Sequence, residues 1–495
     1  MIRVRWRTSV SYLGTVLKGL TVPLLVSALV SLAYGESVVP LGATAALSLL
    51  VGVTLERLER DGLGPRETFL MVALTWLSIA LLGALPFFLA GTGVFADPVN
   101  ALFEGMSGIT TTGATVINDF EAHPRGVLFW RQLLQWLGGL GILILAVALL
   151  SQLSVGGARL METESQTTDL TKLAPRITET ARLLGGLYAA LTAAMTLILL
   201  ALYAVGAAPG MTPYNAVSHA LTTVSTAGFS PEAQSVGAFS PVVQWVVVAF
   251  MFVGATNFVL LYYLVRGDPT RLRKSEEFRF YLAVVAGATL LTAGFLALDG
   301  TFPGTEETVR HATFQVVSIV TTTGYASTDF NTWSVGARHV LFLGMFMGGM
   351  AGSTTCSIKT FRWLVVLKSF RRDLLTAIHP DAIRPVRLGS SVVDEETIRD
   401  VYAYVLLSVV IFVALTVFIV VDVGRAGVRM GEFDVMSAAA STFLNIGPAF
   451  GPAGPYGSYD VFPTTTKLAM VVLMWVGRIE IIPVLVLFTP RFWRE

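Results

Sequence analysis

DPVNALFEGMSGITTTG, residues 97–113, is the stretch that decides the fold, because three related stretches follow it along the chain. They are MTPYNAVSHALTTVSTAG (211–228), ETVRHATFQVVSIVTTTG (307–324) and GEFDVMSAAASTFLNIG (431–447). Each ends in a glycine, and each carries a small hydroxyl residue six positions before that glycine: Ser107, Thr222, Ser318 and Ser441. The chain therefore contains a fourfold internal repeat.

Each copy has the pattern of a segment that enters a membrane and turns back. A helix-start signal precedes a moderately apolar stretch of about 10 to 14 residues, well short of what a spanning helix needs. A polar strip with a glycine follows, and it cannot continue a helix comfortably. One such strip is most simply a polar turn. Four at equivalent positions indicate a shared central cavity, because non-helical backbone at membrane depth is tolerated only where it lines protein or water.

The chain around the repeats has the composition of a membrane protein. Of its 495 residues, 54% are hydrophobic and 14% are charged, which is too apolar for an ordinary soluble domain. Ten charge-poor runs are candidate transmembrane helices: about 17–33, 41–55, 69–90, 127–150, 183–205, 242–265, 280–297, 339–367, 402–421 and 468–488. The sequence predicts an all-α polytopic membrane protein with four fused helix–pore-loop–helix units around a central pore, plus two extra N-terminal transmembrane helices.

This organisation divides the chain into five segments. Residues 1–66 hold the two N-terminal helices, and the pore units are expected at 67–158, 159–274, 275–390 and 391–495. The Arg-rich start could belong to a signal peptide, but no clear small-residue cleavage site precedes the second run, which favours a retained helix.

The distribution of positive charge predicts the orientation. Alternate segments between the runs are rich in Lys and Arg and should face the cytoplasm: Arg3, Arg5, Arg7, Arg57, Arg60, Arg66, Arg159, Lys172, Arg176, Arg266, Arg271, Arg273, Lys274, Lys368, Arg371, Arg372, Arg384, Arg387, Arg491 and Arg494. The other segments carry acids instead. We expect a multi-pass protein of a prokaryotic plasma membrane with both termini cytoplasmic. The net charge of +1 gives no indication of nucleic-acid binding, and the single cysteine, Cys356, excludes an internal disulfide.

The four strips have the chemistry of a cation filter. A monovalent cation that loses its water needs several neutral oxygens at once, and backbone carbonyls supply them without a fixed charge that would trap the ion. Glycine permits the backbone angles that turn successive carbonyls toward one axis. The predicted ion-binding residues are Thr111, Thr112, Gly113, Thr226, Ala227, Gly228, Thr322, Thr323, Gly324, Asn445, Ile446 and Gly447. No other metal site and no cofactor bound by this chain is expected.

The strips SGITTTGATV, TTVSTAGFS, TTTGYAS and LNIGPAFG resemble those of the Trk/Ktr/HKT superfamily of potassium transporters. Further similar stretches are NFVLLY (257–262), GGMAGSTTCSIKTFR (348–362), AIHPDAIRPVRL (377–388) and GRIEIIPVLVLFTPRFW (477–493), so the similarity covers essentially the whole chain. Two extra N-terminal helices and the HP-containing segment favour the TrkH branch. The resemblance implies potassium uptake by channel-like conduction. A potassium symporter coupled to H⁺ or Na⁺, or a sodium-permeable relative, is the alternative.

The first strip bears on selectivity. In the plant HKT relatives a serine in place of the first glycine accompanies sodium preference, so Gly113 favours potassium, with rubidium also admitted. The fourth strip departs most from the others, with Asn445, Ile446 and Pro448, which implies a filter without true fourfold symmetry.

A glycine-rich stretch inside an apolar run is a candidate gate. Three glycines and several hydroxyl residues interrupt the run 339–367. Close helix packing through small residues would also explain them. In the resembling family this region is an intramembrane loop that obstructs the pore, which favours the gate. The predicted gate residues are Gly348, Gly349, Gly352, Ser353, Thr354, Thr355 and Arg478.

Two charges in the last apolar run, Arg478 and Glu480, need partners because an unpaired charge in a membrane is costly. The resemblance suggests that Arg478 faces the pore near the gate loop. A structural ion pair, or an arginine that reaches the interface, is the alternative. Glu104, His219 and Gln315, nine positions before their glycines, are expected to brace the half-helices rather than bind the ion.

Other function classes fit less well. A secondary transporter for an organic solute predicts two inverted halves, whereas the four copies run in one direction. No HExxH, P-loop or convincing nucleophile motif is present, so we expect no enzyme. No predicted cytoplasmic segment is long enough for a nucleotide-binding domain. The resemblance therefore implies a separate cytoplasmic TrkA-like nucleotide-binding regulatory subunit, and a homodimer in membrane lipid.

Overall fold

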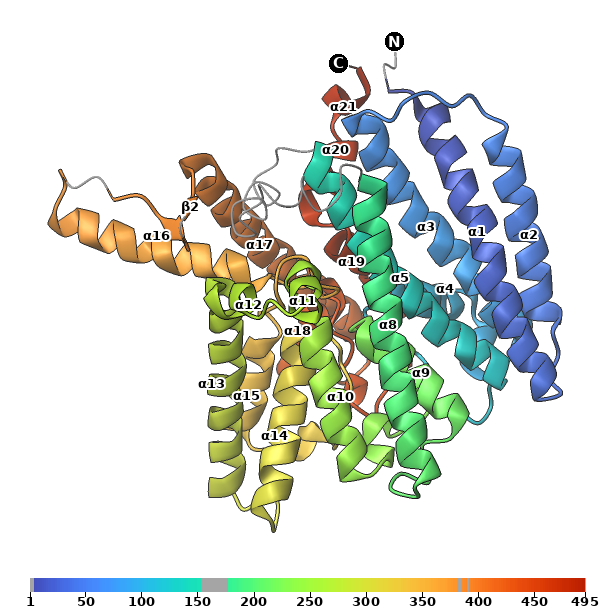
Figure 1. The fold of residues 1–495 in the computed structure, drawn as a ribbon. Helices are drawn as coiled ribbons and strands as arrows, with labels where there is room; N and C mark the ends of the chain where they lie inside the picture. The colour runs from blue at the N-terminus through green and yellow to red at the C-terminus, as the bar shows by residue number, and fades with distance from the viewer. Residues whose placement is uncertain (1–3, 153–176, 382–383, 390, 495) are drawn as a thin grey trace.

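The computed structural model describes residues 4–152, 177–381, 384–389 and 391–494, and this part of the chain is almost entirely helical. Its only paired strands are β1 (Arg387–Leu388) and β2 (Ser391–Val392), a short antiparallel hairpin. Both termini lie at the same end of the molecule (Figure 1). Within the described ranges, 7 helices are long and apolar enough to cross a membrane, and one bent pair passes the same test. The predicted polytopic fold is confirmed.

The first two helices form a hairpin beside the rest of the molecule. α1 (Trp6–Ala33) and α2 (Val39–Glu56) pack on each other and contact α3 (Pro65–Ala90), and α1 also contacts α5 (Arg125–Gln152). Two glycines permit the close crossing: a Cβ added at Gly14 would lie 2.7 Å from the Gly52 carbonyl oxygen, and one added at Gly52 would lie 2.8 Å from that of Gly14. Small residues at a crossing are how membrane helices approach closely.

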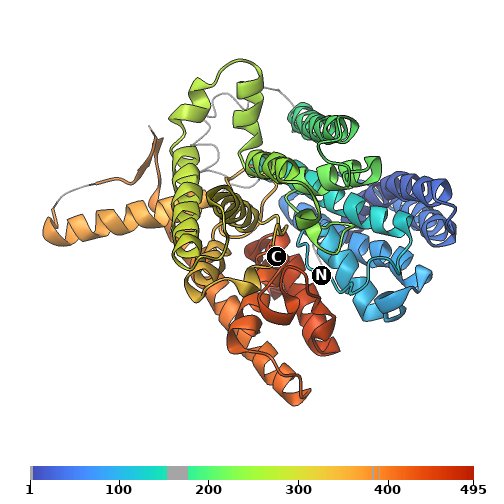
Figure 2. The same ribbon diagram turned by 90° about the horizontal axis from the view of Figure 1, so that it is seen from below.

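The remaining chain repeats one arrangement four times: a long helix, a half-helix, a glycine strip and a second helix. Unit 1 consists of α3, α4 (Pro98–Ile109) and α5. Unit 2 consists of α8 (Ile177–Ala204), α9 (Pro213–Val224), α10 (Pro241–Gly254) and α11 (Phe258–Val265). Unit 3 consists of α13 (Glu276–Leu298), α14 (Thr305–Val320), α15 (Val335–Gly344) and α16 (Thr360–Ile378). Unit 4 consists of α17 (Glu395–Arg425), α18 (Glu432–Phe443), α19 (Thr464–Arg478) and α20 (Ile481–Leu487). Seen from below, the units follow one another around a common centre (Figure 2).

Short elements make up the rest of the helices in the described part of the chain. They are α12 (Thr270–Lys274), α21 (Pro490–Arg494), and the 3-10 turns η1 (Gly93–Ala96), η2 (Ser235–Ala238), η3 (Phe330–Thr332), η4 (Gly451–Ala453) and η5 (Tyr459–Val461). α16 leaves the bundle and extends to one side (Figure 1).

Three of the four half-helices, α4, α9 and α18, begin at side chains that cap them. The Asp97 carboxylate accepts a hydrogen bond from the Val99 amide (2.8 Å) and starts α4, with Pro98 in its first turn. Thr212 caps α9 in the same way ahead of Pro213. In α18, Asp434 accepts from the Gly431 amide (3.2 Å). Such capping satisfies the amide groups that the first turn of a helix leaves free.

Three of the ten predicted spans are not continuous helices; this corrects the prediction for the runs 242–265 and 468–488, whereas the glycine-rich stretch already indicated a break in the run 339–367. The run 242–265 bends by 109° between α10 and α11, because the Asn257 side chain accepts from the amides of Val259 and Leu260 and starts a new helix. The run 339–367 is interrupted by residues 345–359, and the run 468–488 breaks after Arg478. Hydropathy measures the solvent that a segment prefers, not the direction of its backbone. Arg3, Arg159, Lys172, Arg176 and the predicted boundary at 158–159 lie outside the described residues.

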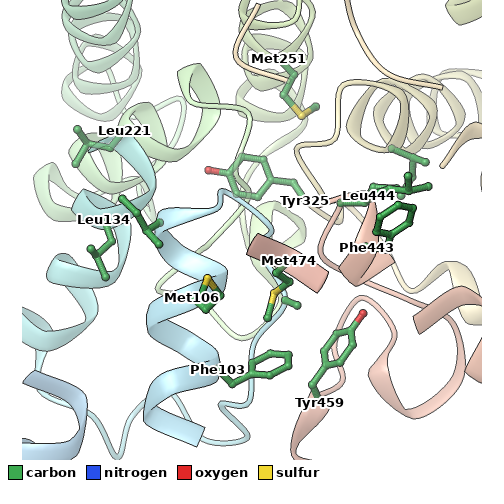
Figure 3. Packing of buried hydrophobic residues seen from close by; sticks show 14 of the residues in the cluster. Phe103, Met106, Leu134, Leu221, Met251, Tyr325, Phe443, Leu444, Tyr459 and Met474 are labelled. Atoms are coloured by element: carbon green, nitrogen blue, oxygen red, sulfur yellow. The ribbon is translucent and has the colours of Figure 1, made fainter. Parts of the chain in front are cut away.

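Buried apolar side chains from several units surround the strips (Figure 3). The labelled members are Phe103, Met106, Leu134, Leu221, Met251, Tyr325, Phe443, Leu444, Tyr459 and Met474. This shell excludes water from behind the strips, so the polar groups of the strip backbone must be satisfied by protein or by whatever occupies the centre.

Candidate ion-binding site at the centre of the four units

The four strips share one unusual backbone conformation. In each, two residues with one residue between them have a positive φ. The pairs are Thr111 (54°) and Gly113 (80°), Thr226 (50°) and Gly228 (77°), Thr322 (53°) and Gly324 (79°), and Asn445 (55°) and Gly447 (114°). Threonine rarely adopts this region because its branched side chain crowds the backbone. The same strain at four equivalent places indicates a functional geometry.

The recurring hydroxyl residue marks the end of each half-helix. The amide of the residue before the glycine donates to the carbonyl of that hydroxyl residue: Thr112 to Ser107, Ala227 to Thr222, Thr323 to Ser318 and Ile446 to Ser441, each 2.9 Å. This bond is the Schellman closure of a helix C-terminus. Four helix C-termini therefore end at the strips, and their partial negative charge favours a cation there.

The four glycines lie next to one another in a ring. A Cβ added at Gly113 would lie 2.4 Å from the Ala227 carbonyl oxygen, and one added at Gly228 would lie 1.7 Å from that of Thr323. One added at Gly324 would lie 2.0 Å from the Ile446 oxygen, and one at Gly447 would lie 2.9 Å from the Thr112 oxygen. Each glycine thus faces the carbonyl of the next unit, in the order 1, 2, 3, 4 and back to 1. The ring leaves no room for a side chain.

A cavity of about 120 Å³ opens on one side of the ring. All four glycines line it, together with polar residues of the loops, among them Asn118, Glu232 and Tyr456. Among the described residues, Glu232 is the one acidic residue in the lining of this cavity, and its carboxylate accepts a hydrogen bond from the Asn215 side chain (2.8 Å).

On the other side, residues 345–359 form a loop between α15 and α16 that contacts two of the four strips. The Thr354 hydroxyl lies 3.0 Å from that of Thr226, and the Cys356 amide donates to the Thr322 hydroxyl (3.0 Å). The other predicted gate residues, Gly348, Gly349, Gly352, Ser353 and Thr355, belong to the same loop. Position 349 has room only for glycine, since an added Cβ would lie 2.7 Å from the Ala255 carbonyl oxygen.

Comparison with known proteins identifies the architecture. The TrkH family model, described as a cation transport protein, matches residues 45–297 and 303–495. The chain is 37% identical to the Trk system potassium uptake protein TrkH of Halomonas elongata, over 98% of each chain. It is 33% identical to that of Vibrio parahaemolyticus, over 99% of this chain and 100% of the relative. The crystal structure of the potassium transporter TrkH from Vibrio parahaemolyticus matches with a TM-score of 0.87 at 31% identity, covering 99% of this chain and 100% of that one.

The chain belongs to the TrkH family of cation transport proteins. The predicted resemblance is thereby confirmed, as is the prediction of a transporter rather than an enzyme. Membership, together with the apolar helices, makes the chain an integral membrane protein.

Arg478 holds the loop of this TrkH-family chain in place. Its guanidinium donates to the Thr354 carbonyl (3.0 Å), the Cys356 sulfur (2.7 Å) and the Gly138 carbonyl (2.8 Å), and the residue is 2% exposed. No ion pair to Arg478 is found within the described ranges. The alternative of a structural ion pair for Arg478 is therefore wrong for this part of the chain, and the neighbouring Glu480 pairs with Arg362 instead (2.7 Å).

The half-helix residues nine positions before the glycines hold the chain that leaves each strip. Glu104 accepts from the Val116 amide (3.0 Å), and His219 lies 3.0 Å from the Ser230 hydroxyl. Gln315, in the amide orientation that satisfies both of its groups, accepts from the Ser327 amide (2.8 Å). In unit 4, where the ninth position is Ala438, Ser437 accepts from the Phe450 amide (2.8 Å). These residues brace the strips from behind.

Sequence reasoning missed two cross-unit supports on α5. Arg131 forms a buried ion pair with Glu104, donates to the Ser230 carbonyl (2.9 Å) and stacks on Phe229 with 3.5 Å to the ring centroid. Gln135 donates to the Ala227 carbonyl (2.6 Å) and accepts from the Phe229 amide (2.9 Å). Their one sequence signal is that both are polar residues inside the apolar run 127–150.

A third support was also missed. The Tyr459 hydroxyl donates to the Gly447 carbonyl (2.8 Å), and the Tyr459 amide donates to the Thr115 carbonyl (2.8 Å). Tyr459 lies in η5, outside every repeat, so no alignment of the four copies could have found it.

Proposed function

We propose that this chain carries potassium across the plasma membrane through the ring of four strips. The proposed ion-binding residues are the twelve strip residues named from the sequence, with main-chain carbonyls as the principal ligands. The observation that carries the proposal is the cyclic contact of each filter glycine with the next unit's carbonyl, because it joins the four strips into one ring, where main-chain carbonyls can replace the water around a cation. The names of the relatives as potassium uptake proteins support the choice of ion.

The loop 345–359 is proposed as the gate. Arg478 holds Thr354 and Cys356, and these two residues in turn contact Thr226 and Thr322 at the end of two strips. The loop thus lies against the strips on the side opposite the outer cavity. Moving it requires breaking the Arg478 hydrogen bonds, which a partner bound to neighbouring surfaces could drive.

The proposed setting is a prokaryotic plasma membrane, with both termini cytoplasmic and the cavity outside. The common end of the two termini (Figure 1) and the Arg-rich sequence next to each terminus support this orientation. The relatives are named as parts of a Trk system, which supports a separate regulatory subunit. We propose a TrkA-like nucleotide-binding partner and a homodimer. The five-segment division of the chain is retained as part of the proposal.

Reconstitution tests the function directly. Purified chain in liposomes loaded with K⁺ should take up ⁸⁶Rb⁺ when the outward K⁺ gradient drives the uptake. External K⁺ should compete with this uptake far better than external Na⁺. Uptake that needs an imposed H⁺ or Na⁺ gradient would favour the coupled symporter. Equal competition by Na⁺ and K⁺ would contradict the proposed filter.

A further inference from the structure

We propose that Tyr459 tunes the cation selectivity of the ring by holding the Gly447 carbonyl, so that the glycine carbonyls offer three free oxygens rather than four. The inference rests on the proposed function, because it assumes that a permeating cation is bound at the ring.

The glycine carbonyls are not equivalent. The Gly447 oxygen accepts a hydrogen bond from the Tyr459 hydroxyl (2.8 Å), and Tyr459 is 2% exposed. Among the described residues, the carbonyls of Gly113, Gly228 and Gly324 accept no hydrogen bond. The φ of Gly447 is 114°, whereas the other three lie between 77° and 80°. An added Cβ at Gly447 would lie 2.9 Å from the carbonyl oxygen of the next strip, the largest of the four distances in the ring.

A second tyrosine shows that this contact is not a general feature of the ring. Tyr325 follows the glycine of strip 3, and its hydroxyl contacts Thr222, six positions before Gly228. The Tyr459 hydroxyl likewise lies close to Ser441, six positions before Gly447. The two tyrosines therefore occupy matching places behind units 2 and 4. The remaining contacts of the Tyr325 hydroxyl are Thr223 and the His219 carbonyl, and neither is a strip carbonyl.

Tyr459 reaches this place from outside the repeat. Strips 2 and 3 carry an aromatic residue directly after the glycine, whereas strip 1 carries Ala114. Tyr459 occupies the seam between units 4 and 1: its amide donates to the Thr115 carbonyl (2.8 Å), and its ring lies 5.6 Å from that of Phe103. It is fixed to both neighbouring strips, so its hydroxyl cannot swing away without disturbing them.

The consequence for a bound cation is electrostatic. A carbonyl oxygen that accepts an O–H hydrogen bond presents less negative potential to an ion than a free one. Selectivity between large and small cations depends on the number and strength of the carbonyl ligands around the ion. A donor on one glycine carbonyl therefore weakens binding of K⁺ or Rb⁺, the ions that need the fullest carbonyl cage. Among the twelve proposed ion-binding residues, the Ala227 carbonyl, one residue before Gly228, is the other one that accepts a hydrogen bond from a side chain, that of Gln135.

The test compares Tyr459→Phe with Tyr325→Phe in the full chain, reconstituted in liposomes, by ⁸⁶Rb⁺ uptake with Na⁺ as competitor. We expect Tyr459→Phe to lower the half-saturating Rb⁺ concentration about three- to fivefold, the change that one net hydrogen bond allows, and Tyr325→Phe to change it by less than about twofold. Replacement of Tyr459 by 3-fluorotyrosine, a stronger donor, should shift the same constant in the opposite direction.

An unchanged constant in Tyr459→Phe, or an equal shift in Tyr325→Phe, would overturn the inference. Should Tyr459→Phe not fold, the 3-fluorotyrosine variants at the two positions decide the matter: a shift at 459 alone supports the inference, and any other result refutes it. Wild-type liposomes without selective Rb⁺ uptake would remove the proposed function itself, whereas selective uptake with an unaltered Tyr459→Phe would remove only this inference.

Discussion

Three threonines in a left-handed backbone show how much local strain this chain accepts. Thr111, Thr226 and Thr322 have φ values between 50° and 54°, where a branched side chain is strongly disfavoured. The fourth strip has Asn445 in this place, a residue that tolerates the conformation better. The strain persists because the helix closure before it and the glycine after it fix the backbone on both sides.

Serine substitutions in the ring should have graded effects. Gly113, Gly228 and Gly324 share nearly the same φ, so the left-handed penalty of about 1–2 kcal/mol is common to all three. Only the space differs: an added Cβ at Gly113, Gly228 and Gly324 would lie 2.4, 1.7 and 2.0 Å from the facing carbonyl oxygen. We expect Rb⁺ over Na⁺ discrimination to fall least in Gly113→Ser, more in Gly324→Ser and most in Gly228→Ser. Gly186→Ser, on α8 with open space around it, is the control. Equal discrimination in all four variants would contradict the filter assignment.

A buried histidine in the outer loop should make stability depend on pH. Burial, with the Arg131 charge adding to it, lowers the pKa of His123 from 6.5 to about 4, while Asp119 opposes the shift. The folded protein thus favours the neutral ring, which lies 2.8 Å from the Thr92 hydroxyl. The stabilisation is complete above pH 6.5 and is lost as the pH falls toward 4. Melting temperatures in detergent should decline over this range, with a shallower slope in His123→Gln. Parallel slopes would show that His123 is not a source of the dependence.

At the scale of elements, the loop 345–359 replaces what hydropathy predicts as the middle of a helix. Its backbone is tied to the break in unit 2, where the Met350 amide donates to the Ala255 carbonyl (2.9 Å) and the Phe258 amide donates to the Gly352 carbonyl (3.0 Å). Two helix breaks distant in sequence thus satisfy each other's backbone groups, which is the condition for irregular chain inside a membrane.

One hydroxyl should distinguish gating from packing in this loop. The Thr354 hydroxyl lies 3.0 Å from that of Thr226 and donates to the Gly254 carbonyl (3.1 Å). Thr354→Val should raise basal Rb⁺ uptake about fivefold, the equivalent of about 1 kcal/mol for a lost hydrogen bond, and leave Na⁺ competition unchanged. Thr355→Val is the control within the same loop, because among the described residues its hydroxyl bonds Ser353 and Lys359 and no strip residue. An equal rise in both variants, or none in Thr354→Val, would show that the contact between Thr354 and Thr226 does not hold the loop closed.

Some of these elements could be predicted from the sequence and others could not. The half-helices and strips could be predicted because capping residues, half-length apolar stretches and glycines are local signals, repeated four times. The break at Asn257 could not, because an asparagine inside an apolar run shows its capping role only once the following amides turn toward it. Tyr459 was missed because one of its partners, Thr115, is more than 340 positions away and nothing local marks the contact.

At the scale of the whole molecule, the α1–α2 hairpin stands outside the ring. It contacts α3 and α5, the long helices of unit 1, and none of its residues lines the central cavity. The hairpin should therefore contribute to stability without affecting which ion passes.

Gly52→Val tests this separation. The added atoms would meet the backbone of α1 at Gly14 and Lys18, 2.6 to 2.8 Å away, so we expect overpacking to cost about 1–3 kcal/mol. The melting temperature in detergent should fall, and Na⁺ competition should stay as in the wild type. Gly42→Val, on the same helix with nothing nearby, should leave both unchanged. A changed ion preference in Gly52→Val would mean that the hairpin influences the ring.

The four strips of the ring, its four corners, are encoded at separate positions of one chain. A single substitution therefore changes only one of them. A pore assembled from four identical chains has no such freedom, since every substitution appears at all corners together. In this chain the strips of units 2 and 3 touch the loop, the strip of unit 2 is also bound by a glutamine, and the strip of unit 4 is bound by a tyrosine. A substitution that alters closing can therefore be made at another strip than one that alters ion preference.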